Sequence, residues 1–331
     1  MRWTIDKVNA YCAQFPWGYG ANFSPSNAIN QLEMWQEDTF SPDLIDKELG
    51  YAERIGMTLM RVYLHDLAYL AAPVGFLKRV ETYLAIAQKH KIRTLLTIFD
   101  DCWNDNPKIG TQPAPKPFTH NSGWVRSPGN APTENTLEWP RLEQYVKALI
   151  KHFSNDPRIF GWDIYNEPGN SERLNKSFPF LKVAFSWARE AGNTQPLTCG
   201  LWHNLKEFEE LNAFMAEESD VLSYHCYTGM KESLERMAEM KTLAQGRRIL
   251  CTEYLARPNN NFKEMLPIFK REGIDAINWG LVSGKTQTIY PWGWTEEKGK
   301  PERYHHDVFN TDGTLLHPEE EKVFEDIMKC K

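Results

Sequence analysis

Residues 159–168 read IFGWDIYNEP, a short run of mostly apolar and aromatic residues that ends in polar ones. Such a run predicts a buried β-strand over 159–166. An amphipathic run with helical spacing follows at 178–191. Together the two runs form a strand and helix unit, and the same order recurs along the rest of the chain.

Seven further strand-like runs alternate with helical ones. Strict alternation predicts a parallel sheet. No Gly-rich phosphate motif follows the first strand, and eight units are the number that closes a barrel. We therefore predict an α/β fold, a single (β/α)8 TIM barrel spanning 1–331. The predicted strands are 18–23, 58–64, 92–99, 159–166, 196–200, 221–225, 249–253 and 276–281, and the helices are 42–55, 74–90, 141–153, 178–191, 205–215, 231–244, 262–271 and 319–328.

A long loop separates the third and fourth predicted strands. Residues 100–140 contain seven prolines and little apolar periodicity. The loop leaves the carboxyl end of a strand, where barrel enzymes build their sites. We expect it to shape a cleft, although a plain surface excursion has the same composition.

The composition excludes some classes of protein. The chain of 331 residues has 41% hydrophobic residues but no apolar run near the ~18 that cross a bilayer. Its net charge of −6 and its lack of a basic block argue against nucleic acid as a partner. The first residues do not have the pattern of a signal peptide. Nothing indicates the oligomeric state.

Two glutamates end predicted strands, Glu167 after the fourth and Glu253 after the seventh. In a closed barrel these strands lie across the mouth from each other, so the carboxyl groups can approach to about 5 Å. Such a pair can flank one glycosidic bond, one carboxylate attacking carbon and the other, with a raised pKa, donating a proton. Either glutamate alone would be read as a salt-bridge or helix-terminus residue.

The segment YNEP at 165–168, Glu253 and Trp279 resemble the glycoside hydrolases of clan A, especially the cellulase-like family 5 enzymes. The resemblance covers essentially the whole chain. It implies hydrolysis of a β-linked glycoside with net retention, without metal or cofactor. By position, it implies Glu167 as acid/base, Glu253 as nucleophile and Asn166 as donor to the substrate 2-hydroxyl.

The resemblance also covers residues on other strands. Arg61 matches an arginine that keeps the nucleophile ionised; a peripheral salt bridge is the alternative. His225 and Tyr227 have the i, i+2 spacing that points both side chains the same way, and match a His-x-Tyr motif. His225 could instead be an ordinary core histidine. Trp279 is expected as the floor beneath the sugar.

One departure from the family pattern concerns the end of the third strand, where many members carry a histidine and this chain reads DDCW at 100–103. Hydroxyl recognition there must differ. Further acidic and aromatic residues at strand exits could bind sugar. The alternative for the tryptophans is packing within loops, and for Glu33 and Asp66 it is capping a helix or pairing with an arginine. These weaker candidates are Glu33, Asp66, Asp100, Trp103, Trp124, Trp202 and Trp292.

We therefore predict a retaining β-glycoside hydrolase acting on plant or host-type oligo- or polysaccharide, exo-acting if the long loop closes the cleft. A catalytically silent carbohydrate-binding barrel and a transglycosylase are the alternatives. The motif HHD at 305–307 lacks repeated zinc-ligand spacing, and GLVSGKT at 280–286 is one residue short of a phosphate loop. A periplasmic or secreted location is favoured.

Overall fold

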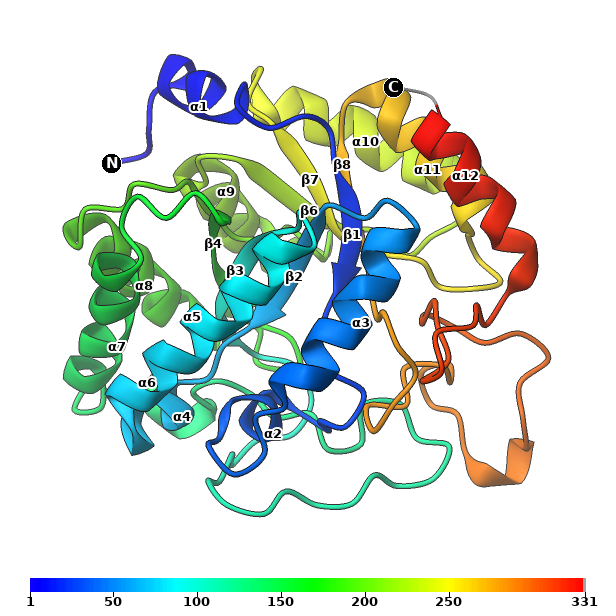
Figure 1. Cartoon of the computed structure of the whole chain (residues 1–331). Coiled ribbons are helices and arrows are strands. Elements are labelled where there is room, and N and C mark those ends of the chain that lie inside the picture. The colour runs from blue at the N-terminus through cyan, green and yellow to red at the C-terminus, as the bar shows by residue number, and fades with distance from the viewer. Residues whose placement is uncertain (330–331) are drawn as a thin grey trace.

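The computed structural model describes residues 1–329, and the predicted barrel is confirmed (Figure 1). Parallel strands form one 8-stranded sheet in the order β5-β4-β3-β2-β1-β8-β7-β6. A bridge between Leu201, just beyond β5, and Tyr224 in β6 connects the two ends of this order. The strands are β1 Tyr19–Asn22, β2 Leu59–Tyr63, β3 Arg93–Asp100, β4 Ile159–Asn166, β5 Leu197–Thr198, β6 Leu222–His225, β7 Ile249–Tyr254 and β8 Asp275–Asn278.

The predicted helices are present around the sheet. The fifth begins later than predicted, because Lys206–Phe208 form a 3-10 turn before it. The eight helices are α3 Pro42–Arg54, α5 Pro73–Lys89, α7 Trp139–His152, α8 Phe178–Glu190, α9 Glu209–Glu218, α10 Met230–Ala244, α11 Phe262–Glu272 and α12 Glu321–Lys329.

Sequence periodicity missed the shorter helices, which contain too few turns to show a 3.6-residue pattern. They are α1 Ile5–Cys12, α2 Gln31–Trp35, α4 Asp66–Ala71 and α6 Asn130–Glu134, with 3-10 turns η1 Leu174–Ser177, η2 Lys206–Phe208, η3 Glu296–Lys298 and η4 Pro318–Glu320.

The barrel interior has an apolar layer and a polar layer. At the amino ends of the strands, Leu59, Leu95 and Leu250 pack with Val8 of α1, which covers this end (Figure 1). Since side chains two residues apart share a strand face, Arg61 points into the barrel above Leu59. The layer nearer the carboxyl ends is polar and buried, and it includes Arg61, Thr97, Asp163, Thr198 and Ser223.

Two long loops lie together at the opposite end from α1 (Figure 1). The loop after β3 folds back on itself through a bridge between Asp100 and Ser127. It is joined to the loop after β8, since the Phe118 N–H donates to Gln287 Oε1 at 2.9 Å. The expectation that residues 100–140 shape a cleft is met, because Trp124 of this loop lines the large cleft described below. Within residues 1–329, no helix is long and apolar enough to cross a membrane.

Candidate active site

A cleft of about 820 Å³ lies over the carboxyl ends of the strands. The candidate glutamates Glu167 and Glu253 both line it, with His225 and Tyr227. Its aromatic walls suit the apolar C–H faces of a sugar. They comprise Trp103, Trp124, Trp202, Trp279 and Trp292.

The two glutamates come from opposite sides of the barrel mouth. Glu167 directly follows β4 in the left-handed region, with φ +44°, which is unusual for a non-glycine residue and turns the chain out of the sheet. Glu253 lies in β7 opposite His225 of β6, where the register between the strands shifts. Carboxylate oxygens of both glutamates and a ring nitrogen of His225 lie within 4.8 Å of one another. This spacing suits a double-displacement glycosidase, which needs about 5 Å.

Three donors hold the Glu253 carboxylate. Arg61 Nη1 donates to Oε1 at 2.8 Å, and the Tyr63 hydroxyl donates to the same oxygen at 2.9 Å. The Tyr227 hydroxyl donates to Oε2 at 2.6 Å. Together these contacts fix the orientation of the Glu253 carboxyl group at the floor of the cleft.

Tyr63 was missed by the sequence prediction, although its i+2 position after Arg61 on one strand could have indicated it.

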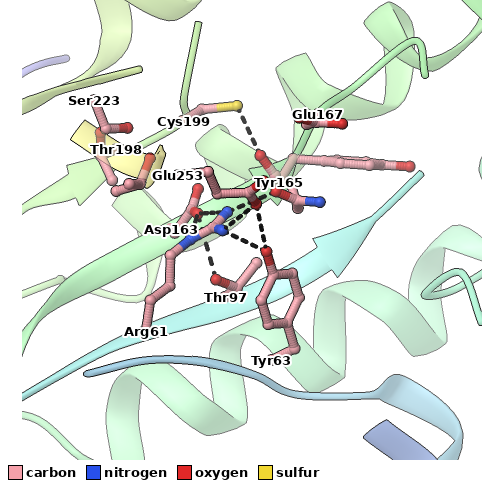
Figure 2. Close-up of polar contacts among 12 residues, drawn as sticks. Arg61, Tyr63, Thr97, Asp163, Tyr165, Glu167, Thr198, Cys199, Ser223 and Glu253 are labelled. Atoms are coloured by element: carbon pink, nitrogen blue, oxygen red, sulfur yellow. Dashed lines mark hydrogen bonds and ion pairs between the residues drawn. The ribbon is translucent and has the colours of Figure 1, made fainter. Parts of the chain in front are cut away.

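Arg61 joins Glu253 to the fourth strand (Figure 2). Its Nη2 lies 2.6 Å from Asp163 Oδ2 and donates to Asn166 Oδ1 at 2.7 Å. Nη1 also donates to Asn22 Oδ1 at 2.9 Å. Arg61 is completely buried, so this is an internal ion-pair network rather than a peripheral salt bridge.

Glu167 is also surrounded by donors. His225 Nδ1 lies 2.7 Å from Oε1, the Cys102 thiol lies 3.2 Å from Oε2, and the Asn170 amide donates to Oε2. Burial would raise the pKa of Glu167, but hydrogen bonding to His225 and the charge of that ring, with the other two donors, hold it below its ordinary value. The expectation of a raised pKa is therefore wrong, because the sequence does not reveal that His225 and Cys102, from distant segments, contact this carboxylate.

The Asn166 amide is fully engaged by protein atoms. Its Nδ2 donates to Asp100 Oδ1 at 2.9 Å and to Cys102 Sγ at 3.3 Å, while its Oδ1 accepts from Arg61. An amide nitrogen carries two hydrogens. Donation to a substrate 2-hydroxyl, as the resemblance implies, would therefore require one of these contacts to open.

Trp279 forms part of the cleft floor, directly after β8. Its ring packs edge-on against Tyr63 and Trp124, with centroids 5.7 and 5.6 Å apart. Trp292 packs on Tyr227 at 4.9 Å and is 44% exposed. Trp202 lines the wall next to Glu167 and donates to the Pro168 carbonyl at 3.1 Å.

The three weaker acidic candidates do not line the cleft. Glu33 pairs with Lys285 and lies in the first turn of α2, and Asp66 pairs with Arg141 at 2.6 Å in the first turn of α4. Asp100 is buried behind Asn166, where burial raises its pKa to about 7. Glu33 and Asp66 thus have structural partners, whereas Asp100 supports a residue of the site.

Further cleft residues were missed because they lie in loops or on helix surfaces without a local signal. The loops contribute polar groups, and α10 contributes an acidic face. They are Cys102, His120, Asn121, Asn170, Ser171, His203, Asn204, Cys226, Thr228, Glu232, Glu235, Arg236 and Glu239.

By distance alone, Glu167, His225 and Glu253 could hold a metal ion. Every one of their carboxylate oxygens already faces a donor, and Arg61 presents its positive charge 2.8 Å from Glu253. A cation would be repelled by this guanidinium. The arrangement favours proton transfer and nucleophilic attack.

No family model matches the chain. A probable mannan endo-1,4-beta-mannosidase F from Aspergillus flavus is 22% identical over 148 residues, which are 38% of this chain and 29% of that protein. A similarly named protein from Aspergillus oryzae matches equally. The chain thus spans less than a third of the length of the curated relatives it matches.

Solved structures are similar over 95% of the chain. A GH5_18 protein from Streptomyces cattleya, in complex with Manb1-4GlcNAc, has a TM-score of 0.67 at 13% identity, with 81% of it covered. The chain has the fold of these proteins. An endo-beta-1,4-mannanase from Thermotoga petrophila has a TM-score of 0.58 at 15% identity and 78% coverage. An exo-beta-1,4-mannosidase from Opitutaceae bacterium strain TAV5 has a TM-score of 0.63 at 14% identity and 59% coverage.

The expected likeness to cellulase-like glycoside hydrolases of clan A is therefore confirmed at the level of the fold.

Proposed function

We propose that this protein is a retaining β-glycoside hydrolase, with Glu253 as nucleophile and Glu167 as acid/base. The observation that carries the proposal is the approach of the two carboxylates to within 4.8 Å in an aromatic cleft. Inverting enzymes need a wider gap, because a water molecule must fit between sugar and base. The fold shared with mannanases and mannosidases agrees with this chemistry.

The reaction begins with Glu253 bonding to the anomeric carbon as the bond to the leaving oxygen breaks. That oxygen takes the proton of the Glu167 carboxyl group, whose Oε1 lies 2.7 Å from His225 Nδ1. Water then adds its hydroxyl to the anomeric carbon, returns a proton to Glu167 and releases Glu253. Because the pKa of Glu167 is lowered, the step in which it acts as an acid should be favoured at acidic pH.

We infer exo-action from how the two long loops meet. The Asn121 N–H donates to the Thr286 carbonyl at 2.8 Å, and His120 Nδ1 lies 2.8 Å from the Tyr290 carbonyl. These loops continue into Trp124, which packs on Trp279, and into Trp292, which packs on Tyr227, a donor to Glu253. A wall there leaves room for a terminal sugar rather than for a continuing chain.

A β-mannoside is the substrate we propose. The similar proteins carry names that concern mannans and mannosides, and one was solved with Manb1-4GlcNAc. A substrate derived from plant or host glycans favours a periplasmic or secreted location.

The test uses 4-nitrophenyl β-mannoside, β-glucoside, β-galactoside and β-xyloside, with the first product anomer read by NMR. We expect retention and a preference for the mannoside. Glu253→Gln should abolish turnover. Glu167→Gln should slow the hydrolysis of glycosides with poor leaving groups and spare that of glycosides with good ones. Glu209→Gln on the surface of α9 is the control. Normal turnover by Glu253→Gln would contradict the assignment.

Two alternatives have separate signatures. A silent sugar-binding barrel would bind the glycosides without releasing nitrophenol at any pH. A transglycosylase would form longer oligosaccharides when acceptor sugar is added. Exo-action predicts mannose as the first product from mannohexaose, and a mixture of internal fragments would overturn it.

A further inference from the structure

We propose that Cys102 is a positioning residue whose thiol holds the carboxylate plane of Glu167 and links it through Asn166 to Asp100. The proposal rests on the proposed function, since it concerns how the acid/base works. Cys102 lies in the cleft two residues after the end of β3, and it is 7% exposed.

The direction of the thiol hydrogen follows from the neighbouring contacts. Cys102 Sγ accepts from Asn166 Nδ2 at 3.3 Å, so its own hydrogen is available for another acceptor. Glu167 Oε2 lies 3.2 Å away and is such an acceptor. Burial and the charges of Glu167 and Asp100 raise the pKa of the thiol far above its ordinary value. The thiol therefore remains protonated and acts as a donor.

Asp100 anchors the other end of this chain. It accepts from Asn166 Nδ2 at 2.9 Å and from Trp124 Nε1 at 2.7 Å. The Cys102 backbone N–H also donates to Asp100 Oδ1 at 2.9 Å, which fixes the main chain that carries the thiol. Cys102 thus has a fixed backbone beside the Glu167 carboxylate.

The consequence concerns the two oxygens of Glu167. Oε2 is held by Cys102 and Asn170, and Oε1 faces His225 Nδ1. If the thiol is removed, the carboxylate can rotate away from this geometry. Loss of a donor to the ionised form also raises the pKa of Glu167. We therefore expect removal of the thiol to slow the steps in which Glu167 transfers a proton and to leave other steps unchanged.

The experiment compares Cys102→Ala and Cys102→Ser with the wild type on aryl β-mannosides of differing leaving-group acidity. We expect Cys102→Ala to lower kcat/KM about tenfold for phenyl mannoside and less than about twofold for dinitrophenyl mannoside. Its alkaline pH limit should move upward. Cys102→Ser retains a donor and should recover activity to within about threefold of the wild type.

Cys12→Ala is the matched control, because Cys12 is a buried thiol at the opposite end of the barrel. Thermal unfolding checks that all variants are folded. An equal loss on every leaving group with an unchanged pH profile would overturn the role of Cys102. If instead the wild type cleaves none of the mannosides or other glycosides, the proposed function fails, and the two failures are distinguishable.

Discussion

Arg61 Nη1 lies 2.8 Å from Glu253 Oε1, an ion pair between β2 and β7 in which the guanidinium is completely buried. The same guanidinium lies 2.6 Å from Asp163. Two buried carboxylates thus depend on one cation. Stability and the proposed nucleophile are linked through this side chain.

Arg61→Met should destabilise the fold strongly, because it leaves Asp163 and Glu253 buried without a cation. We expect the free energy of unfolding to fall by about 3–5 kcal/mol, measured by urea denaturation at pH 7. Arg303→Met is the control, since Arg303 pairs with Glu319 at the surface, and it should cost less than about 1 kcal/mol. If Arg61→Met lowered the free energy of unfolding as little as Arg303→Met, the stabilising role of this ion-pair network would be contradicted.

Tyr227→Phe removes the hydroxyl that donates to Glu253 Oε2 at 2.6 Å. We expect kcat/KM for aryl β-mannosides to fall about tenfold, the usual cost of losing a hydrogen bond to a charged group. Tyr145→Phe serves as control, because the Tyr145 hydroxyl is buried in the helical layer without a hydrogen-bond partner in the described chain. Equal activities of the two variants would argue against a role for Tyr227.

Asp307 should make stability depend on pH. It is buried near Glu48, and burial raises its pKa to about 7, although Thr288 and the charge of Arg257 oppose this. A carboxyl group with a raised pKa in the folded state contributes most below its unfolded pKa. That contribution is lost as pH rises toward 7.

Asp307→Asn keeps an acceptor for Thr288 and removes this loss. The variant should gain about 1–4 kcal/mol over the wild type at pH 8 and almost nothing at pH 4. Urea denaturation at both pH values measures the difference. Glu48 remains in both proteins, and loss of the Asp307 charge lowers its pKa, which adds to the gain at pH 8. A gain that is independent of pH would show that Asp307 is not its source.

Trp292→Ala should weaken sugar binding more than turnover. Trp292 presents a half-exposed ring over the cleft and packs on Tyr227 at 4.9 Å. We expect KM for aryl β-mannosides to rise about tenfold and kcat to change by less than about threefold. Trp294 lies in the same loop but outside the cleft, so Trp294→Ala is the control and should leave KM unchanged. A large fall in kcat with little change in KM would argue against stacking of the sugar on this ring.

Local patterns accounted for the barrel because each strand and helix is set by short-range periodicity. Residues 159–166 were predicted and observed as the same strand, β4. β5 was predicted as 196–200 but contains only Leu197–Thr198, because the chain beyond it pairs through the single bridge from Leu201. Helix α1 was missed, because its few apolar residues show no clear helical period. They are buried only through contact with the end of the barrel.

The sequence by itself determined that Glu167 and Glu253 end strands of a parallel barrel, because strand ends can be located from short apolar runs. Only the tertiary structure decided what surrounds them. Tyr63 lies 190 residues from Glu253 in the sequence, and Cys102 lies 65 residues from Glu167, yet each contacts its carboxylate. Such contacts depend on how the closed sheet packs and on how its loops meet, and no local pattern encodes either.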